Sequence, residues 1–222
     1  MEHIRKPFAG MLLLLLLTSP GIVSQTKNAK IMFFVGKVEI SQNGNSREAS
    51  KGMQIRTGDT VTTGTQSSVI IRDTSSNNIK MRENSSLVYS RENDRTELTL
   101  AAGSVFSKVQ KLGKDPHYFV KTPTMVAAVR GTEFFVAYGS RNNDLWVCVN
   151  EGIVSVSTTA AKKSVDLKEG EGVMISEGTR VSDPRRYEWT RKLNWNMDPD
   201  RGQVIDDTDV NEAYKETESH DW

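Results

Sequence analysis

The strongest constraint on the fold is a long series of short β-type segments separated by turn residues, which extends from Lys30 to about Ile175. Runs of β-branched and aromatic residues are typical of strands, and Asn43-Gly44-Asn45 is typical of a hairpin turn because Asn and Gly tolerate positive φ angles. No part of this region shows a convincing apolar repeat at helical spacing. The pattern predicts an all-β domain, built as a sandwich, a jelly roll or a solenoid-like stack.

An internal similarity predicts that this domain contains two similar β-units. Residues 36–41 resemble residues 152–157, and residues 55–61 resemble residues 167–173. A Gly-containing strand and a later Gly-acid turn therefore occur twice, which indicates two related units packed together within residues 25–178.

The N-terminal segment has the three regions of a secretory signal. Arg5 and Lys6 precede the apolar run Met11–Leu17, and the small residue Ser24 stands at a suitable cleavage position. The apolar run is shorter than the ~20 residues that span a bilayer as a helix. No cysteine stands at the cleavage position to accept a lipid. We therefore assign residues 1–24 to a cleaved signal peptide and expect a periplasmic or otherwise exported protein without a spanning helix.

Charge argues against a nucleic-acid partner. The formal net charge of the 222-residue chain is +1, and loss of the signal peptide leaves the remainder close to neutral. Phosphate binding needs a basic surface, which a neutral chain lacks. The single cysteine, Cys148, rules out an internal disulfide and is expected to be buried among its apolar neighbours.

Two segments after the β region differ from it in character. Asp183 and Pro184 are typical of a helix start, so we predict a helix within residues 179–195, with aromatic residues packed on or near the β domain. Residues 196–222 are rich in Asp and Glu. We expect them to form a solvated and mostly disordered acidic tail.

The middle of the chain contains a specific motif, residues 120–134, which reads VKTPTMVAAVRGTEF. Six further segments accompany it: 36–38, 58–64, 67–73, 83–87, 151–154 and 170–173. Together these segments resemble the FecR domain family. The resemblance extends from about Lys30 to Ile175 and implies a single FecR-type β domain in the cell envelope.

The namesake proteins of this family are similar to transmembrane anti-sigma regulators, with a cytoplasmic N-terminal domain and a C-terminal domain that contacts a receptor. Here Met1–Pro7 precede the apolar run, which is too few residues for a sigma-binding domain. The residues after the β domain do not resemble the receptor-contacting domain. The resemblance therefore implies a standalone exported FecR-domain protein and only weakly an iron-signalling role.

The first candidate binding group combines Arg130, Glu133 and Asp59. An arginine can hold a carboxylate through two parallel hydrogen bonds. Arg130 could bind an acidic ligand or partner, or it could close a turn by pairing with Glu133 or Asp59; we favour the structural interpretation. The glycines that we expect to form turns are Gly58, Gly131, Gly152 and Gly170.

The second candidate group is Arg185, Arg186 and Trp189 in the predicted helix. Basic and aromatic side chains together can contact an anionic membrane surface or a partner protein. The same side chains can also belong to a helix that packs on the β domain with its charges in water, which we favour.

Catalytic motifs are absent from the sequence. The chain has three histidines and no nucleophile elbow, phosphate-binding loop or zinc-protease motif. The acidic residues between Asp198 and Asp209 do not have the spacing of a calcium-binding loop. We therefore predict no catalytic residue, no metal site and no cofactor.

These observations predict an exported, non-catalytic binding or sensing module that engages an envelope protein or an envelope polymer, with peripheral membrane contact possible. One alternative is a component of FecR-type transmembrane signalling that regulates a sigma factor. A second alternative is a structural protein of the envelope.

Overall fold

The computed structural model describes residues 28–111, 115, 117–159, 164–209 and 212. The regular secondary structure of these residues is almost entirely β-strand, which confirms the predicted all-β class. Two short 3₁₀ turns, η1 (Glu188–Arg191) and η2 (Pro199–Arg201), follow the last strands. The predicted signal peptide, residues 1–24, lies outside the described residues.

The strands form two facing sheets, called A and B. Sheet A contains, in spatial order, β4 (Gln54–Ile55), β1 (Ala29–Val35), β6 (Ser68–Arg72), β7 (Asn78–Met81), the second half of β9 (Arg95–Lys108), β12 (Glu133–Gly139), β13 (Asp144–Glu151) and β16 (Glu171–Ser176), which pairs with β17 (Arg180–Val181) and β18 (Arg185–Arg186). Sheet B contains β3 (Asn45–Glu48), β2 (Val38–Gln42), β5 (Thr60–Thr63), β8 (Ser86–Glu92), the first half of β9, β10 (Tyr118–Lys121), β11 (Met125–Val129), β14 (Ile153–Thr158) and β15 (Ser164–Lys168).

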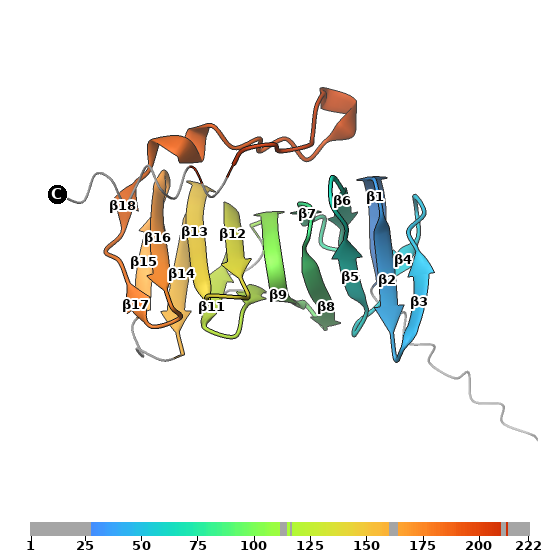
Figure 1. Cartoon of the computed structure of the whole chain (residues 1–222), viewed down its shortest axis with the longest axis horizontal. Coiled ribbons are helices and arrows are strands. Elements are labelled where there is room, and N and C mark those ends of the chain that lie inside the picture. Colours follow the sequence, from blue (N-terminus) through green and yellow to red (C-terminus); the bar gives the residue numbers. More distant parts are fainter. Residues whose placement is uncertain (1–27, 112–114, 116, 160–163, 210–211, 213–222) are drawn as a thin grey trace, which may run out of the picture.

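The chain advances along the molecule from one end to the other while it passes back and forth between the two sheets (Figure 1). Neighbouring strands among the described residues are antiparallel, apart from the parallel pair β9–β10. Of the architectures that the sequence left open, the structure is therefore a sandwich with a solenoid-like progression.

The predicted two-unit repeat is only partly seen in this arrangement. Residues 36–41 and 152–157 both lead into strands of sheet B, β2 and β14. Residues 55–61 pass from sheet A to sheet B, whereas residues 167–173 pass from sheet B to sheet A. The similar sequences therefore reflect similar local strands and turns. The unit that repeats in the structure is shorter, and it is the passage of the chain from one sheet to the other.

Strand β9 links the two sheets because it bends in its middle. The register with β8 shifts between Ser86 and Leu87, and Gly103 has a φ of +84°. A Cβ atom at Gly103 would lie 2.5 Å from the Cα atom of Ser85, so the bend requires glycine.

The main hydrophobic core fills the space between the sheets. Inward-facing positions alternate along each strand, as in β12, where Phe134 and Val136 point into this core. A second apolar cluster lies on the outer face of sheet A and is covered by residues 187–209, which we call the C-terminal strap. After β18 the strap runs back along the molecule toward β7 and β6 (Figure 1).

The helix predicted within residues 179–195 is wrong. These residues form β17, β18 and the four-residue turn η1 instead. Arg185 and Arg186 pair with Gly172 and Glu171 of β16, because the edge of sheet A supplies hydrogen-bond partners for an extended backbone.

The prediction of a solvated tail from residue 196 is also wrong for residues 196–209. Met197, Val204 and Asp206 are buried, and they belong to the strap. Burial of apolar surface on sheet A and the pairing of Asp206 with a cation offset the high acidic content of this segment. The remainder of the predicted tail falls outside the described residues, apart from residue 212.

Candidate functional site

Asp59 stabilises the turn between β4 and β5. Its buried carboxylate accepts hydrogen bonds from the side chain of Arg47 and from the backbone N–H of Arg56, both at 2.9 Å. A carboxylate that holds a turn in this way has a structural role. The structure gives Asp59 partners other than Arg130.

Glu133 begins β12 and is also buried. One carboxylate oxygen lies 3.4 Å from Lys108 Nζ, and the other accepts a hydrogen bond of 2.7 Å from Asn150. Arg130 is exposed on the turn between β11 and β12, at a small hollow that it shares with His117. The predicted group of Arg130, Glu133 and Asp59 is therefore divided into an exposed arginine and two buried carboxylates with their own partners.

The four glycines expected in turns have positive φ angles. The values are +88° at Gly58, +64° at Gly131, +89° at Gly152 and +77° at Gly170. Packing is tightest at Gly152, where a Cβ atom would lie 2.7 Å from the carbonyl oxygen of Gly131. The β11–β12 and β13–β14 turns therefore pack closely against each other at these two glycines.

The basic pair Arg185 and Arg186 lies in β18 at the edge of sheet A. Arg185 Nε donates a hydrogen bond of 3.1 Å to the Tyr187 hydroxyl, and its guanidinium carbon is 5.4 Å from the centre of that ring. Trp189 lies in η1, and its side chain is outside what the structure describes. The two arginines are thus fixed at the point where the strap leaves the sheet.

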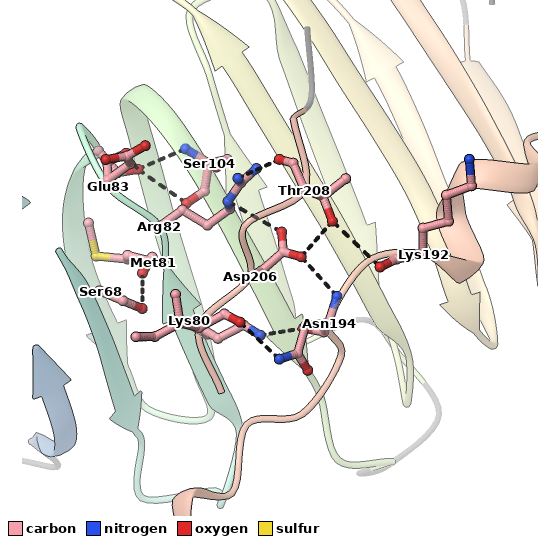
Figure 2. A network of polar contacts seen from close by, with 12 residues as sticks. Ser68, Lys80, Met81, Arg82, Glu83, Ser104, Lys192, Asn194, Asp206 and Thr208 are labelled. Atoms are coloured by element: carbon pink, nitrogen blue, oxygen red, sulfur yellow. Dashed lines mark hydrogen bonds and ion pairs between the residues drawn. The ribbon is translucent and has the colours of Figure 1, made fainter. Parts of the chain in front are cut away.

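A polar network that sequence reasoning missed connects β7 to the strap (Figure 2). Lys80 is completely buried on the outer side of β7, and its ammonium group donates to the backbone carbonyls of Asn194, Asn196 and Val204. The ammonium also lies 4.2 Å from the ring centre of Phe106, close enough for a cation–π interaction. Lys80 therefore binds two separate stretches of the strap at once.

Arg82, the residue that follows β7, supplies the second cationic contact. Its Nε lies 3.3 Å from the carboxylate of Asp206, and its Nη2 donates a 2.7 Å hydrogen bond to the backbone carbonyl of Thr208. The Asp206 carboxylate also accepts hydrogen bonds from Asn194 N–H and from the Thr208 hydroxyl. Because Asp206 is almost fully buried, this ion pair is desolvated and sensitive to loss of either partner.

Burial changes the protonation of two groups beneath the strap. Desolvation lowers the pKa of Lys80 to about 8, although the nearby Asp206 carboxylate opposes this shift. Desolvation also raises the pKa of the Cys148 thiol to about 12, so this cysteine is unreactive at neutral pH. Cys148 is buried as its neighbours predict, but it faces the strap and not the core between the sheets.

A second buried ion pair closes one end of the main core. Arg91 and Asp73 lie 3.2 Å apart with almost no exposed surface, and Thr96 donates a hydrogen bond to the same carboxylate. This pair joins the end of β6 to β8 and the start of β9. Its groups bind one another, which indicates a structural role.

An open groove of about 640 Å³ lies beside the end of the strap. The groove is lined by residues 82–84, which follow β7, by strands β9, β12 and β13 of sheet A, and by residues 207–209 of the strap. Polar side chains on its rim include Asn84, Asn142, Asp144 and Asp207. The rim of the groove offers hydrogen-bond donors and acceptors to a peptide or polymer.

Two further structural properties bear on function. Within the described residues, no group of three or more His, Cys, Asp and Glu side chains could hold a metal ion. No helix in the same part of the chain is long and apolar enough to cross a membrane.

Comparison with known proteins identifies the central part of the chain. Residues 59–155 match the family model described as FecR protein, which confirms the predicted family resemblance over that segment. No protein with a curated function matches the chain.

Solved structures show a similar fold. Two crystal structures of a proposed anti-sigma factor from Parabacteroides distasonis, at 1.65 Å and 2.50 Å resolution, each match 57% of this chain with a TM-score of 0.52 and 15% sequence identity. The match covers 59% of that protein's chain, so this chain corresponds to about three fifths of it. At this identity, the likeness establishes a shared fold.

Proposed function

The chain carries a FecR-type domain in residues 59–155, and from this premise we propose that it is a non-catalytic binding and sensing module of the bacterial cell envelope. Its partner in this proposal is an envelope protein or an envelope polymer. The family match is the observation that carries the proposal, because the family and its structural relatives indicate a regulatory role.

The distribution of charged groups supports binding at a surface and argues against chemistry at a buried site. Three buried carboxylates bind cations or amide groups of the domain itself; they belong to Asp59, Glu133 and Asp73. None of them is presented to a solvent-filled cavity as a general acid or base would be. The groove beside the strap is different, because its rim residues are accessible to a partner.

The apolar segment within residues 1–24 supports an exported location. A basic region, a leucine-rich run and a small residue follow one another there, as in secretory signals. We therefore place the domain on the outer side of the cytoplasmic membrane, where it can meet envelope partners.

A second candidate function is regulation of a sigma factor as part of a transmembrane signalling system. The observation that favours it is the shared fold with the proposed anti-sigma factor from Parabacteroides distasonis. In that case the FecR-type domain receives the signal outside the membrane and another segment transmits it.

Fractionation of cells and the intact mass of the native protein test the location. We expect a mass that corresponds to cleavage near Ser24 and a protein in the envelope fraction. An uncleaved protein in the inner membrane would favour the transmembrane signalling candidate. An uncleaved protein in the cytosol would overturn both proposals.

Site-specific photo-crosslinking in cells tests the binding surface. A photoreactive amino acid at Asp207, which is exposed on the groove rim, is expected to form an adduct with an envelope component. The matched control is the same amino acid at Thr99, which is exposed on sheet B. Equal adducts at both positions, or none at Asp207, would contradict binding at the groove.

A further inference from the structure

We propose that the C-terminal strap is an internal ligand: it occupies a surface of sheet A that binds an extended, carboxylate-bearing segment of a partner protein, and its release opens that surface. The identity of the occupant as a protein segment rests on the proposed function as a binding module. The releasable nature of the strap rests on the structure alone.

The outer face of sheet A is apolar beneath the strap. Phe106, Phe135 and Cys148 are paired neighbours across β9, β12 and β13, and all three point away from the core between the sheets. The rings of Phe106 and Phe135 lie 4.6 Å apart. An outer sheet face with this composition must be covered, because exposed aromatic surface is unfavourable in water.

The strap covers this face with a few apolar side chains. Tyr187, Leu193 and Met197 are buried against the cluster, and the indole ring of Trp195 meets Phe106 edge-on at 5.2 Å. The cluster is separate from the main core, which lies on the other side of sheet A. Release of the strap therefore exposes the cluster without opening the core.

The polar contacts to the strap recognise mainly its backbone. Lys80 and Arg82 bind backbone carbonyls of the strap and one carboxylate, that of Asp206 (Figure 2). These contacts recognise an extended backbone and a negative charge, with little dependence on other side chains. Any extended segment with a suitably placed Asp or Glu and apolar neighbours can make the same contacts.

The strap is not part of a sheet. Its described residues, 187–209, contain the two 3₁₀ turns and no strand, whereas Arg185 and Arg186 just before it remain paired with β16. The strap can therefore leave sheet A while β18 stays in place as its attachment. Loss of the strap contacts breaks no strand pairing.

The positive charge of this surface determines which kind of partner segment can bind there. Lys80 and Arg82 place two cations on an otherwise apolar face, and their removal from water requires a partner carboxylate or carbonyls. An acidic and apolar peptide segment satisfies both requirements, whereas a neutral polysaccharide lacks the carboxylate. A strap from a second copy of this chain is the competing occupant and is separated by the test below.

The test uses Cys148 as a natural reporter, since it is the one cysteine of the chain and lies under the strap. In the full mature chain, Asp206→Asn removes the charge that pairs with Arg82 and keeps the size of the side chain. We expect a small alkylating reagent to label Cys148 at least about tenfold faster in D206N than in the unchanged protein, because loss of a desolvated ion pair weakens the attachment of the strap to sheet A. Asp166→Asn on the exposed edge strand β15 is the matched control and should leave the rate unchanged.

The occupant is tested with a fluorescein-labelled peptide that has the sequence of residues 187–209. We expect it to bind D206N more tightly than the unchanged protein, and a peptide that itself carries Asp206→Asn to bind less tightly. These assays use purified protein, so a failure of the proposed envelope location does not affect them.

Three results would overturn the proposal. Equal protection of Cys148 in D206N and in the unchanged protein, with no peptide binding, would make the strap a fixed part of the fold. Dimerisation of D206N with Cys148 still protected would assign the surface to a second copy of the chain. If circular dichroism shows that D206N is unfolded, Met197→Ala replaces it, and unchanged labelling in that variant would also reject release.

Discussion

The outer faces of the two sheets differ, although the strands of both sheets alternate in the same way. On sheet A the central outward positions are aromatic or otherwise apolar, and the strap buries them. On sheet B the corresponding positions include Ser90, Thr99 and Ser155, which are partly or fully exposed. Phe119 is the aromatic residue on that face, and the guanidinium of Arg95 lies 3.7 Å above its ring.

This difference shows that a covering segment leaves a signature in the strands that it covers. A sheet with one solvated face has apolar and polar residues in alternation. In β13 the run Leu145–Val149 is apolar at every position, because the odd positions face the core and the even positions face the strap. In β14, which is not covered, Val154 and Val156 alternate with polar residues.

The largest expected difference between the faces concerns their phenylalanines. Phe135→Ala beneath the strap should lower the free energy of unfolding by about 3–5 kcal/mol, because it leaves a cavity in a closed cluster. Phe119→Ala on sheet B removes a partly exposed ring and should cost roughly 1 kcal/mol. Urea denaturation monitored by circular dichroism measures both values. Equal losses would mean that the strap does not seal the outer face of sheet A.

The strap side of the same contact gives a smaller effect. Leu193→Ala should lower the free energy of unfolding by roughly 2–3 kcal/mol, since Leu193 is 4% exposed and packs on the cluster. Ile153→Ala on β14 is the control, because Ile153 is 55% exposed and a change there should stay within about 0.5 kcal/mol. A Leu193→Ala protein as stable as the control would show that the strap contributes little to stability.

The pH dependence of Lys80 sharpens the comparison further. Burial lowers its pKa to about 8 in the folded protein, whereas the unfolded chain keeps the ordinary value of 10.5. Between these values the unfolded chain holds a proton that the folded protein has lost, so the folded protein gains stability as the pH rises. Relative to Lys80→Met, the unchanged protein should become more stable by roughly 1–2 kcal/mol between pH 7.5 and 9.5. If the difference in stability between the two proteins did not change with pH, the Lys80 ammonium would be in contact with water.

Much of the sandwich was predictable from the sequence because strand signals are local. The apolar alternation, the glycine turns and the motif of residues 120–134 all act over a few residues, and they gave the fold class and the family. The order of strands between the sheets was not predictable, since it depends on pairings such as Lys80 with Phe106 that are distant in sequence.

The strap was missed for a different physical reason. Its acidic composition is typical of a solvated tail, and the charges of Asp206 and Arg82 become compatible with burial only when the two are together. One signal was nevertheless present: Lys80 interrupts the apolar strand Ile79–Met81, and a lysine at such a position needs acceptors from another segment. The unbroken apolar run at Leu145–Val149 likewise indicated a covered face.

The smallest expected effect lies on the exposed face of sheet B. Glu97 is bound by Lys121 at 2.7 Å, and this hydrogen bond, with the weaker contact to Arg95, holds the pKa of its carboxyl below the ordinary value of 4.5. The resulting stabilisation is present above pH 4.5 and is lost as the pH falls through the lower pKa of the folded protein. Because the pair is partly exposed, Glu97→Gln should cost only roughly 0.2–1 kcal/mol at pH 7, and this cost should vanish in strong acid and shrink in high salt. Thermal denaturation of both proteins from pH 3 to pH 7 measures it. A cost equal to that measured for D206N under the same conditions would show that ion pairs contribute equally on the two faces, and that the strap gives no special protection from water.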